Sequence, residues 1–451
     1  MSLLTALYSG SSGIEANSED LSVIGNNISN ANTIGFKMSR SDFEEQLSQS
    51  LLGAGSIGMG TNVEMVQQIL TQGSLEQTGN ATDLALQGNG MFVVAGTANG
   101  TTGDFYTRDG EFTINKAGYL VNQNGMQVQG YSADASGGIQ TALGSLQLGS
   151  ATSEPQATAN VTIQANLDAG ATVPSVTPFD PTNAANSSNF NTTVTLYDSL
   201  GDAHQATVYF SKTAAGAWSW NATTDGAGVS GGTAGTPSVI ASGTLSFDTN
   251  GKLSAETQTS NFTPAGATSP QALNFNFGTP TGSGGTGVDG ITDFAGTSTA
   301  TLASQDGYTA GTLSGINIGS DGTVTGTFTN GQQKSIGQVA VASFAAPDRL
   351  EAIGGNLFMA TPDDVTAGAL GEATGTSAGG FTTVSGSGDA TVGAAGAGGR
   401  GSITSGALEQ SNVDITTQFV DMISAQRSFE ANSKTITTAD QMLSDLIQMK
   451  R

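Results

Sequence analysis

Residues 415–446 read ITTQFVDMISAQRSFEANSKTITTADQMLSDL, and large apolar side chains recur in this stretch every seven residues. This first row consists of Ile415, Met422, Phe429, Ile436 and Leu443. A second row, three residues after each of these, is small or polar except at its last member: Gln418, Ala425, Asn432, Ala439 and Leu446. The period predicts an α-helix with one apolar seam that prefers a left-handed crossing with a partner helix. The small second row allows that partner to approach closely.

The N-terminus has the same period. Its row consists of Leu7, Ile14, Leu21 and Ile28, and polar residues occupy the other faces. Each end could instead be an ordinary amphipathic helix packed on its own domain. Because both ends share one period and nearly everything between them is typical of strands, we expect the two helices to pack together. We expect their apolar rows to form an assembly interface, in an inner coiled-coil layer.

The N-terminal row is followed by NNISNANTIGFK, residues 26–37, which is unusually rich in asparagine. Asparagine and glycine accept the left-handed conformations that a helix exit needs, and each Asn side chain offers a donor and an acceptor. We therefore expect a joint between the helix and the rest of the chain, with Phe36 as its anchor and Lys37 as a cation for a carboxylate. A plain helix cap followed by a linker is the simpler alternative. The predicted joint residues are Asn26, Asn27, Asn30, Asn32, Gly35, Phe36 and Lys37.

The interior is typical of short strands joined by turns, because Gly is abundant and Asn-Gly or Asp-Gly pairs separate alternating runs. The predicted hairpin turns are Asp109-Gly110, Asn124-Gly125, Asn250-Gly251, Asp321-Gly322 and Asn330-Gly331. The alternation also predicts strands at 192–197 and 204–210, a buried strand at 335–344, and loops at 278–287 and 390–401. The segment SDFEE, from Ser41, fits a helix capping box.

One short sequence occurs twice. GSLEQT at 73–78 resembles GALEQS at 406–411, and the two copies flank the β-rich interior. We expect the two segments to lie side by side where the chain enters and leaves the β body. Cysteines at Leu75 and Leu408 should then crosslink.

Composition excludes several classes of function. The chain of 451 residues has 37 acidic and 13 basic residues, a formal net charge of −24, which argues against nucleic-acid binding. With no cysteine and one histidine, a soft metal site is not expected, and His204 is expected to be a surface residue of a turn. No nucleophile, base and acid set stands out, so we expect neither an enzyme nor a cofactor. The N-terminus lacks the features of a cleaved signal peptide, and no apolar run is long enough for a membrane span.

Several blocks resemble the bacterial flagellar axial proteins, the rod and hook family. The two ends carry the resemblance through NNISNANTIGFK, 26–37, and SGALEQSNVDITTQFVDMISAQRSFEANSKTI, from Ser405. LALQGNGMFVV, 84–94, and YTRDGEFTINKAGYLV, 106–121, resemble the inner β domain of that family. Three further blocks resemble the hook members in particular: LYDSLGDAH at 196–204, DGYTAGTLSGINIGSDGTVTGTFTNGQ from Asp306, and VASFAAPDRLEAIGGNLF from Val341.

The resemblance implies a mainly β, nested multidomain fold with α-helical termini. Its expected parts are a terminal helical domain (1–35 and 411–451), a connector (36–75 and 396–410), an inner β domain (76–150 and 335–395) and an outer β domain (151–334). The long outer insertion favours a hook subunit over a distal rod protein. Such a subunit self-assembles into a curved tube that works as a universal joint between rod and filament.

The resemblance also implies where the protein works and with what. It implies export by the flagellar type III apparatus without a cleaved signal, and a place outside the cell in the hook and basal body. The implied partners are further copies of the chain, the rod and hook–filament junction proteins, and the hook cap during assembly, with no nucleic acid and no membrane insertion. The rival reading outside this class is a secreted β-rich adhesin or carbohydrate-binding module, which the Thr/Gly/Asn-rich interior supports and the paired heptads do not.

Overall fold

The structure is a computed structural model that describes residues 3–47, 58–361 and 386–449. The chain forms two compact units. The terminal unit comprises Met1–Ala151, Gly315–Thr327 and Gln333–Arg451, and the inserted unit comprises Thr152–Ser314 and Phe328–Gln332. Strands are the most abundant regular structure in the described residues, and the two long helices are at the ends of the chain, so the prediction of a mainly β fold with packed helical termini is confirmed.

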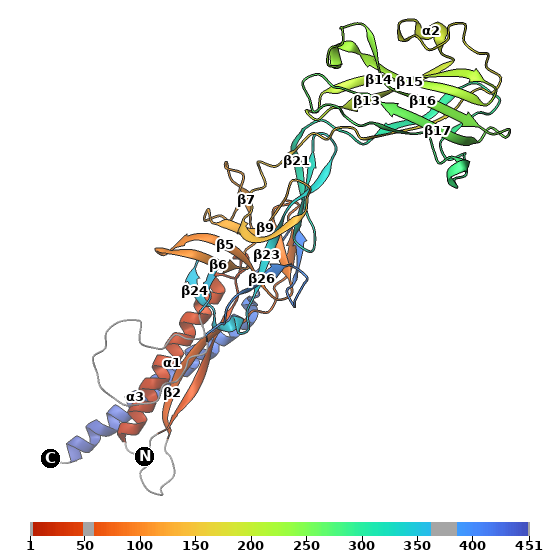
Figure 1. Cartoon of the computed structure of the whole chain (residues 1–451). Helices are drawn as coiled ribbons and strands as arrows, with labels where there is room; N and C mark the ends of the chain where they lie inside the picture. The colour runs from red at the N-terminus through yellow and green to blue at the C-terminus, as the bar shows by residue number, and fades with distance from the viewer. Residues whose placement is uncertain (1–2, 48–57, 362–385, 450–451) are drawn as a thin grey trace. The chain divides into compact units, whose positions relative to one another are not determined.

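The two long helices, α1 (Leu3–Ser29) and α3 (Ile415–Met449), lie side by side in the terminal unit (Figure 1). Helix α3 begins where Asp414 caps it, because Asp414 Oδ1 accepts hydrogen bonds from the backbone N–H groups of Thr416 (2.8 Å) and Thr417 (3.3 Å). Neither helix is long and apolar enough to cross a membrane, and the same holds for every other helix in the described residues.

A long antiparallel hairpin follows α1 and packs along it: strands β1 (Ser39–Leu47) and β2 (Gly58–Gln68) (Figure 1). The prediction of a helix start at Ser41 was therefore wrong, because Ser41 lies within β1 and pairs with Val66. A capping box is a local signal, and here the pairing of nine residues across the hairpin, together with packing against α1, overrides it.

The β body of the terminal unit is built around one large sheet with the strand order β22-β23-β9-β5-β6-β25-β24. Strand β26 also pairs with β23, β10 with β9, and β21 continues the sheet beyond β22. The strands of this sheet are β5 (Met91–Ala98), β6 (Thr101–Thr107), β9 (Gln127–Ala133), β10 (Ile139–Ser145), β21 (Gly311–Ile318), β22 (Thr323–Phe328), β23 (Gln333–Ser343), β24 (Glu351–Gly354), β25 (Leu357–Met359) and β26 (Thr391–Ala394).

Short strands complete the terminal unit. The strands β7 (Thr113–Ile114) and β8 (Leu120–Val121) pair with each other, and β8 also joins the large sheet by pairing with β9. Two further pairs join the entry and exit of the β body: β4 (Leu84–Gln87) with β27 (Ser402–Ser405), and β3 (Leu75–Gln77) with β28 (Ala407–Glu409). A short 3-10 turn, η4, spans Pro347–Arg349.

The inserted unit packs a five-stranded antiparallel sheet, β13 to β17 in chain order, against a smaller sheet formed by β12, β18, β19 and β20. Its large core includes the buried side chains of Trp218 and Trp220. The strands are β11 (Thr152–Ser153), β12 (Asn160–Asn166), β13 (Phe190–Tyr197), β14 (Ala203–Ala214), β15 (Ala217–Asp225), β16 (Pro237–Phe247), β17 (Leu253–Ser260), β18 (Asn274–Asn276), β19 (Ile291–Thr292) and β20 (Thr299–Gln305). The short helical turns are η1 (Pro181–Asn183), α2 (Ala184–Ser187), η2 (Gly226–Gly228) and η3 (Thr281–Ser283).

Four of the five predicted hairpin turns are confirmed, since the strands on either side of each are paired and the glycine has a positive φ. The turn at Asp109-Gly110 is the exception: β6 pairs with β5 and β25, whereas β7 pairs with β8. Gly110 is needed there for a close approach, because a Cβ would lie 1.7 Å from the backbone oxygen of Leu84.

The other strand and loop predictions had mixed outcomes. The strands expected at 192–197 and 204–210 are confirmed as β13 and β14, and the strand expected at 335–344 is β23. The loop expected at 278–287 holds only the short turn η3. The loop expected at 390–401 was partly wrong, because β26 lies inside it and pairs with the buried strand β23.

Candidate functional site

Much of the contact between α1 and α3 is formed by small and polar residues, although Ile436 also packs on Gly10. Gln418, Ala425 and Ala439 of the second row are buried, and they face the partner helix. On α1, a Cβ on Gly10 would lie 2.9 Å from Ile436 Cγ1, and one on Gly13 would lie 2.5 Å from Asn432 Nδ2. A larger residue at Gly10 or Gly13 would force the side chain of Ile436 or Asn432 to move, so these glycines favour the close approach of the two helices.

The predicted apolar rows lie along the edges of this contact. On α1 the half-buried members are Leu7, Ile14, Leu21 and Ile28, and on α3 they are Met422, Phe429, Ile436 and Leu443. Ile415 is exposed. The side chains that the heptad singles out are thus only partly covered within one chain.

A second face of α3 is open to solvent. Phe419, Val420 and Ile423 are 49%, 62% and 51% exposed, and further along the helix Met442 and Ile447 are also exposed. We call Phe419, Val420 and Ile423 the apolar face of α3. Soluble proteins rarely leave contiguous large apolar side chains uncovered unless they bind something there.

The asparagine-rich segment fastens the end of α1 to the strand that follows. The buried side chain of Asn27 accepts a hydrogen bond from the N–H of Ser39 (2.9 Å) and donates to the carbonyl of Ser39 (2.7 Å). It also donates to Gln418 Oε1 of α3 (2.8 Å). One amide therefore ties together α1, β1 and α3.

The next asparagines act at the helix end itself. Asn30 Nδ2 donates to both the carbonyl and the side-chain oxygen of Asn26, at 2.9 and 2.8 Å. The side-chain oxygen of Asn30 accepts a hydrogen bond from Thr33 Oγ1 (3.1 Å). Asn32 is exposed and Phe36 is half-buried. Asn26 and Asn30 thus satisfy polar groups at the end of the last helical turn.

Gly35 allows this segment to pass close to the β body. Its φ is +69°, and a Cβ there would lie 2.6 Å from the backbone nitrogen of Asp109. The N–H of Gly35 donates to the carbonyl of Glu409 (2.7 Å), and Asn356 Nδ2 donates to the carbonyl of Ile34 (2.7 Å). A larger residue at position 35 would both strain the backbone and collide with the backbone of Arg108 and Asp109.

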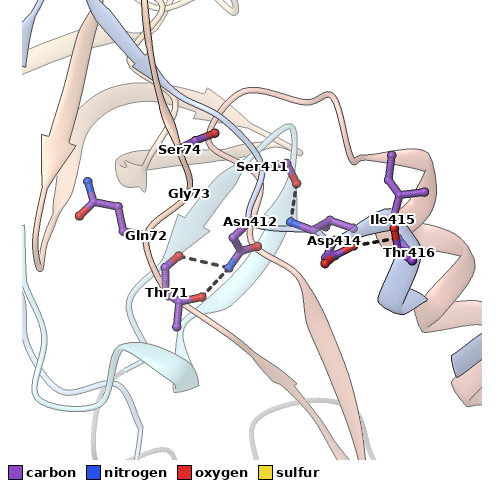
Figure 2. A pocket seen from close by; sticks show the side chains of 10 residues that line it. Thr71, Gln72, Gly73, Ser74, Ser411, Asn412, Asp414, Ile415 and Thr416 are labelled. Carbon is purple, nitrogen blue, oxygen red and sulfur yellow. Dashed lines mark hydrogen bonds between the residues drawn. The ribbon is translucent and has the colours of Figure 1, made fainter. Parts of the chain in front are cut away.

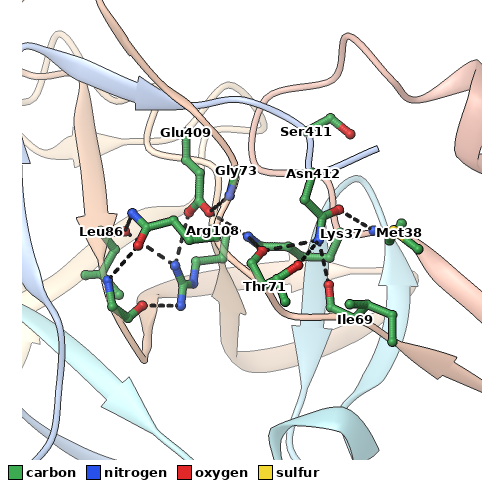
Figure 3. A network of polar contacts seen from close by, with 12 residues as sticks. Lys37, Met38, Ile69, Thr71, Gly73, Leu86, Arg108, Glu409, Ser411 and Asn412 are labelled. Carbon is green, nitrogen blue, oxygen red and sulfur yellow. Dashed lines mark hydrogen bonds and ion pairs between the residues drawn. The ribbon is translucent and has the colours of Figure 1, made fainter. Parts of the chain in front are cut away.

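Lys37, Glu409 and Arg108 form a buried ion cluster at the centre of the joint (Figure 3). Lys37 Nζ lies 2.6 Å from Glu409 Oε1, and Arg108 Nη1 lies 3.0 Å from Glu409 Oε2. The side chains of Lys37 and Glu409 are fully buried, and that of Arg108 is 5% exposed. One carboxylate therefore serves two cations that come from separate parts of the chain.

Backbone groups complete the cluster. The N–H of Gly73 donates to Glu409 Oε1 (2.9 Å), Lys37 Nζ donates to the carbonyl of Thr71 (2.8 Å), and Arg108 Nη2 donates to the carbonyl of Gly88 (2.7 Å). Burial lowers the pKa of the Lys37 ammonium, and hydrogen bonding to Glu409 partly offsets that effect. Burial also raises the pKa of the neighbouring Asp109 to about 6.

Asn412 links the same segments just before α3. Its Oδ1 accepts from the N–H of Met38 (2.8 Å), and its Nδ2 donates to the carbonyls of Ile69 (2.7 Å) and Thr71 (3.2 Å) (Figure 3). An open, largely polar hollow of about 530 Å³ lies beside it, lined by residues 71–74 and 411–416 (Figure 2). No described side chain in this hollow suggests a catalytic group, so we assign it to the joint.

The repeated GSLEQT and GALEQS segments lie side by side, as expected, because β3 and β28 pair in antiparallel fashion. The expected crosslink was one register off. Leu75 lies opposite Glu409 and Leu408 lies opposite Glu76, so the side chains of Leu75 and Leu408 point to opposite faces of the ribbon.

The paired residues Gln77 and Ala407 give the correct crosslink. The pairs at 74/410 and 78/406 carry hydrogen bonds between the strands, so 77/407 is a non-hydrogen-bonded pair with closely spaced Cβ atoms. We expect Gln77→Cys with Ala407→Cys to form a disulfide in the folded chain, because the natural sequence has no cysteine to compete. Non-reducing gel electrophoresis measures it. Leu75→Cys with Leu408→Cys is the matched control, and efficient crosslinking of that pair instead would contradict the register.

Sequence reasoning missed three members of the joint: Arg108, Glu409 and Asn412. Their local sequences were noted for other reasons, since Arg108 precedes a supposed hairpin turn and Glu409 belongs to the repeated segment. The available signal was the scarcity of cations. In a chain with 13 basic residues and 37 acidic ones, each basic residue, Lys37 and Arg108 included, is a candidate for a specific acidic partner.

His204 differs from its expected place. Its side chain is 10% exposed and its Nε2 lies 3.2 Å from Asp198 Oδ2, so the prediction of a surface histidine was wrong. The ring packs against Phe262. Within the described residues, no group of three or more His, Cys, Asp or Glu side chains is placed to hold a metal ion.

Family profiles match along most of the chain. Residues 7–37 match "Flagella basal body rod protein" and residues 404–449 match "Flagellar basal body rod FlgEFG protein C-terminal". Residues 85–168 match "Flagellar hook protein FlgE/F/G D1 domain", and residues 166–308 match "Flagellar basal body protein FlaE D2 domain". Among solved structures, a Helicobacter pylori flagellar hook protein FlgE2 aligns with 63% of this chain and 93% of its own, at 15% identity and a TM-score of 0.41.

Several curated relatives match over nearly their whole length. The flagellar hook protein FlgE of Salmonella typhimurium is 34% identical over 442 residues, which cover 97% of this chain and 98% of the relative. The hook protein FlgE of Borreliella burgdorferi is 34% identical over 491 residues, which cover 99% of this chain and 100% of the relative. The hook protein FlgE of Escherichia coli is 32% identical over 447 residues, covering 97% and 98%. With identity above 30% along almost the full length of both chains, this protein belongs to the flagellar hook protein FlgE family.

Proposed function

We propose that this protein is a structural subunit of the bacterial flagellar hook, which self-assembles into a curved tube and transmits torque from rod to filament as a universal joint. The family to which the chain belongs is structural and not an enzyme family. The observation that carries the assembly step is the apolar face of α3, which the chain leaves open while it covers the opposite side of the same helix with α1.

A polymer explains this face better than a monomer does. A monomer would gain from placing polar residues at Phe419, Val420 and Ile423, whereas a subunit can bury them against the next copy. The half-buried rows on α1 and α3 would be covered in the same step. Because the covering surface belongs to a different part of the neighbour, such contacts repeat without closing and build a tube.

We infer a division of labour along the chain. Residues 1–35 and 411–451 would form the inner tube, 36–75 and 396–410 the connector, 76–150 and 335–395 the inner β domain, and 151–334 the outer β domain. The buried ion cluster and the asparagine contacts support a rigid passage from helices to β body. Full-length similarity to hook proteins favours this role over that of a distal rod protein.

We further propose the partners and location that go with this role. The chain would leave the cell through the flagellar type III apparatus without a cleaved signal and would assemble outside the cell beneath the hook cap. It would contact the rod at one end of the tube and the hook–filament junction proteins at the other. Two measurements test this location and these partners: co-purification of the protein with hook–basal bodies, and the position of the protein in images of them.

Replacing Ile423 with aspartate should block assembly while leaving the subunit folded. The side chain is 51% exposed in the chain, so the change costs little there, but in the tube it would bury an unpaired charge. We expect the critical concentration for tube formation to rise by at least about 10- to 100-fold, which corresponds to about 1.4–2.8 kcal/mol. Sedimentation and negative-stain microscopy measure it.

Val288→Asp is the matched control, because Val288 is 47% exposed and lies in a loop of the inserted unit. It should assemble at nearly the natural concentration. If Val288→Asp blocks tubes and Ile423→Asp does not, the main contacts lie on the inserted unit.

A further inference from the structure

A groove runs between α1, α3 and β1 in the terminal unit. Its volume is about 410 Å³. Val23, Ile24 and Ala425 contribute apolar lining, and Asp20 and Asp421 place one carboxylate each on it, from α1 and α3. We call it the acidic groove.

The polar groups of this groove are only partly satisfied within the chain, since Asp421 accepts one long hydrogen bond, from Gln418 Nε2 (3.4 Å). Ser41 lines it, is buried, and has an Oγ with no hydrogen-bond partner of normal geometry among the described residues, although it lies beside Asp20. Buried hydroxyls are normally paired, so the Ser41 hydroxyl and the two carboxylates can accept a further polar partner in this groove. Burial raises the pKa of the Asp20 carboxyl, and the negative charge of Asp421 raises it further, whereas the Ser41 hydroxyl lowers it.

The basic residue that lines the acidic groove already has partners outside it. Arg40 also lines the groove, but its Nε lies 2.9 Å from Asp42 Oδ1 and its Nη2 donates to Gln67 Oε1 (3.1 Å). Helix α1 has no basic residue, and in the described part of α3 the basic residues are Arg427 and Lys434. A cation for the acidic groove has to come from elsewhere.

Arg427 is exposed and stands on another face of α3. At 3.6 residues per turn, it lies about 120° around the helix from Asp421. It adjoins Val420 and Ile423 of the apolar face, and it forms no ion pair with any carboxylate in the described part of the chain. The surface around Arg427 therefore combines one positive charge with apolar side chains. The acidic groove has two carboxylates and an apolar lining, so the two surfaces are complementary.

We propose that the acidic groove of one subunit receives Arg427 of a second copy, with the guanidinium between Asp20 and Asp421. The inference rests on the proposed function, which it deepens by naming the two surfaces that meet. Groove and arginine lie on different faces of the same helix, so the contact is heterologous and continues from copy to copy. The guanidinium presents several N–H donors, enough to bind both carboxylates and the Ser41 hydroxyl.

A charge-reversal cycle tests the contact on the full-length protein. Arg427→Glu should raise the critical concentration for tubes at least tenfold, because it places a third carboxylate in the groove. Lys252 is an exposed lysine of the inserted unit, and Lys252→Glu makes the same change in net charge. It should change the critical concentration by less than twofold. Asp421→Arg should raise the critical concentration as Arg427→Glu does. The double variant Arg427→Glu with Asp421→Arg should recover at least a third of the lost assembly, measured on the logarithm of the critical concentration.

Crosslinking gives a second measurement that does not depend on rescue. A chain with Asp20→Cys mixed with a chain with Arg427→Cys should yield a disulfide-linked dimer after assembly and none in the unassembled mixture. If the natural protein forms tubes but Arg427→Glu assembles as Lys252→Glu does, or the mixed dimer is absent, the proposal is overturned. If EDTA raises the critical concentration and Arg427→Glu does not, a divalent cation occupies the groove and the proposal is likewise overturned. If the natural protein forms no tubes, the proposed function itself fails.

Discussion

Replacing Glu409 with glutamine lowers the melting temperature of the terminal unit by about 6–20 °C. The variant leaves Lys37 and Arg108 buried with no carboxylate between them. Removing one partner of a buried ion pair costs about 3–5 kcal/mol, because an uncompensated charge stays in the interior. For a domain of 150 residues or more, each kcal/mol corresponds to about 2–4 °C.

The chain provides separate readouts for its two units. Both tryptophans lie in the inserted unit, whereas the long helices lie in the terminal unit. Circular dichroism at the helix band should therefore show the lowered melting temperature, and tryptophan fluorescence should not. Asp42→Asn is the matched control, since it removes the same charge from the exposed Arg40–Asp42 pair and should cost less than about 1 kcal/mol.

The pH dependence separates a charge effect from a packing effect. Burial holds the folded-state pKa of Lys37 below its usual 10.5, so between these two values the unfolded chain binds more protons than the folded chain. Unfolding free energy therefore rises with pH in that window. Without Glu409 the folded-state pKa falls further, so the variant should regain part of its stability from a lower pH upward. A deficit that stays constant with pH would mean that lost packing, and not buried charge, explains the destabilisation.

The periodic features of the sequence were the predictable ones. Seven-residue spacing identified both helices, and Asn-Gly or Asp-Gly pairs identified four of the hairpin turns, because each signal is local. The predictions failed at positions where contacts with residues distant in the sequence determine the local conformation. Position 110 requires glycine because the carbonyl of Leu84 leaves no room for a Cβ. Ser41 lies in a strand because β1 pairs with β2 and packs against α1.

The joint was predicted in outline only. Asparagine and glycine marked the helix exit, but the partners of Lys37 and Asn27 are about 370 and 390 residues away along the chain. No local pattern encodes such pairing. The heptad likewise marked the helical seam without saying which row faces inward. In the structure Gln418, Ala425 and Ala439 of the small row are buried, whereas Ile436 of the apolar row packs on Gly10 and remains half-buried.

Deleting residues 433–451 should abolish tube formation and leave the inserted unit folded. The deletion removes Ile436, which packs on Gly10, and Ala439, which is buried in the helix contact. It leaves the Asn412 contacts, the ion cluster and the first half of α3 in place. The N-terminal half of α1 loses its partner helix, and isolated helical segments of this length are marginal in water.

The two units should respond differently to this truncation. We expect helix content to fall by more than the 19 deleted residues account for, because part of α1 unfolds with them, while tryptophan emission and the inserted unit's melting temperature stay unchanged. Tubes should be absent at 100 times the natural critical concentration, since both the half-buried rows and the helix that presents them are incomplete. A truncated chain that still forms tubes would show that the distal half of α3 is dispensable, and the assembly contact would then lie entirely within the apolar face around Ile423 and the acidic groove.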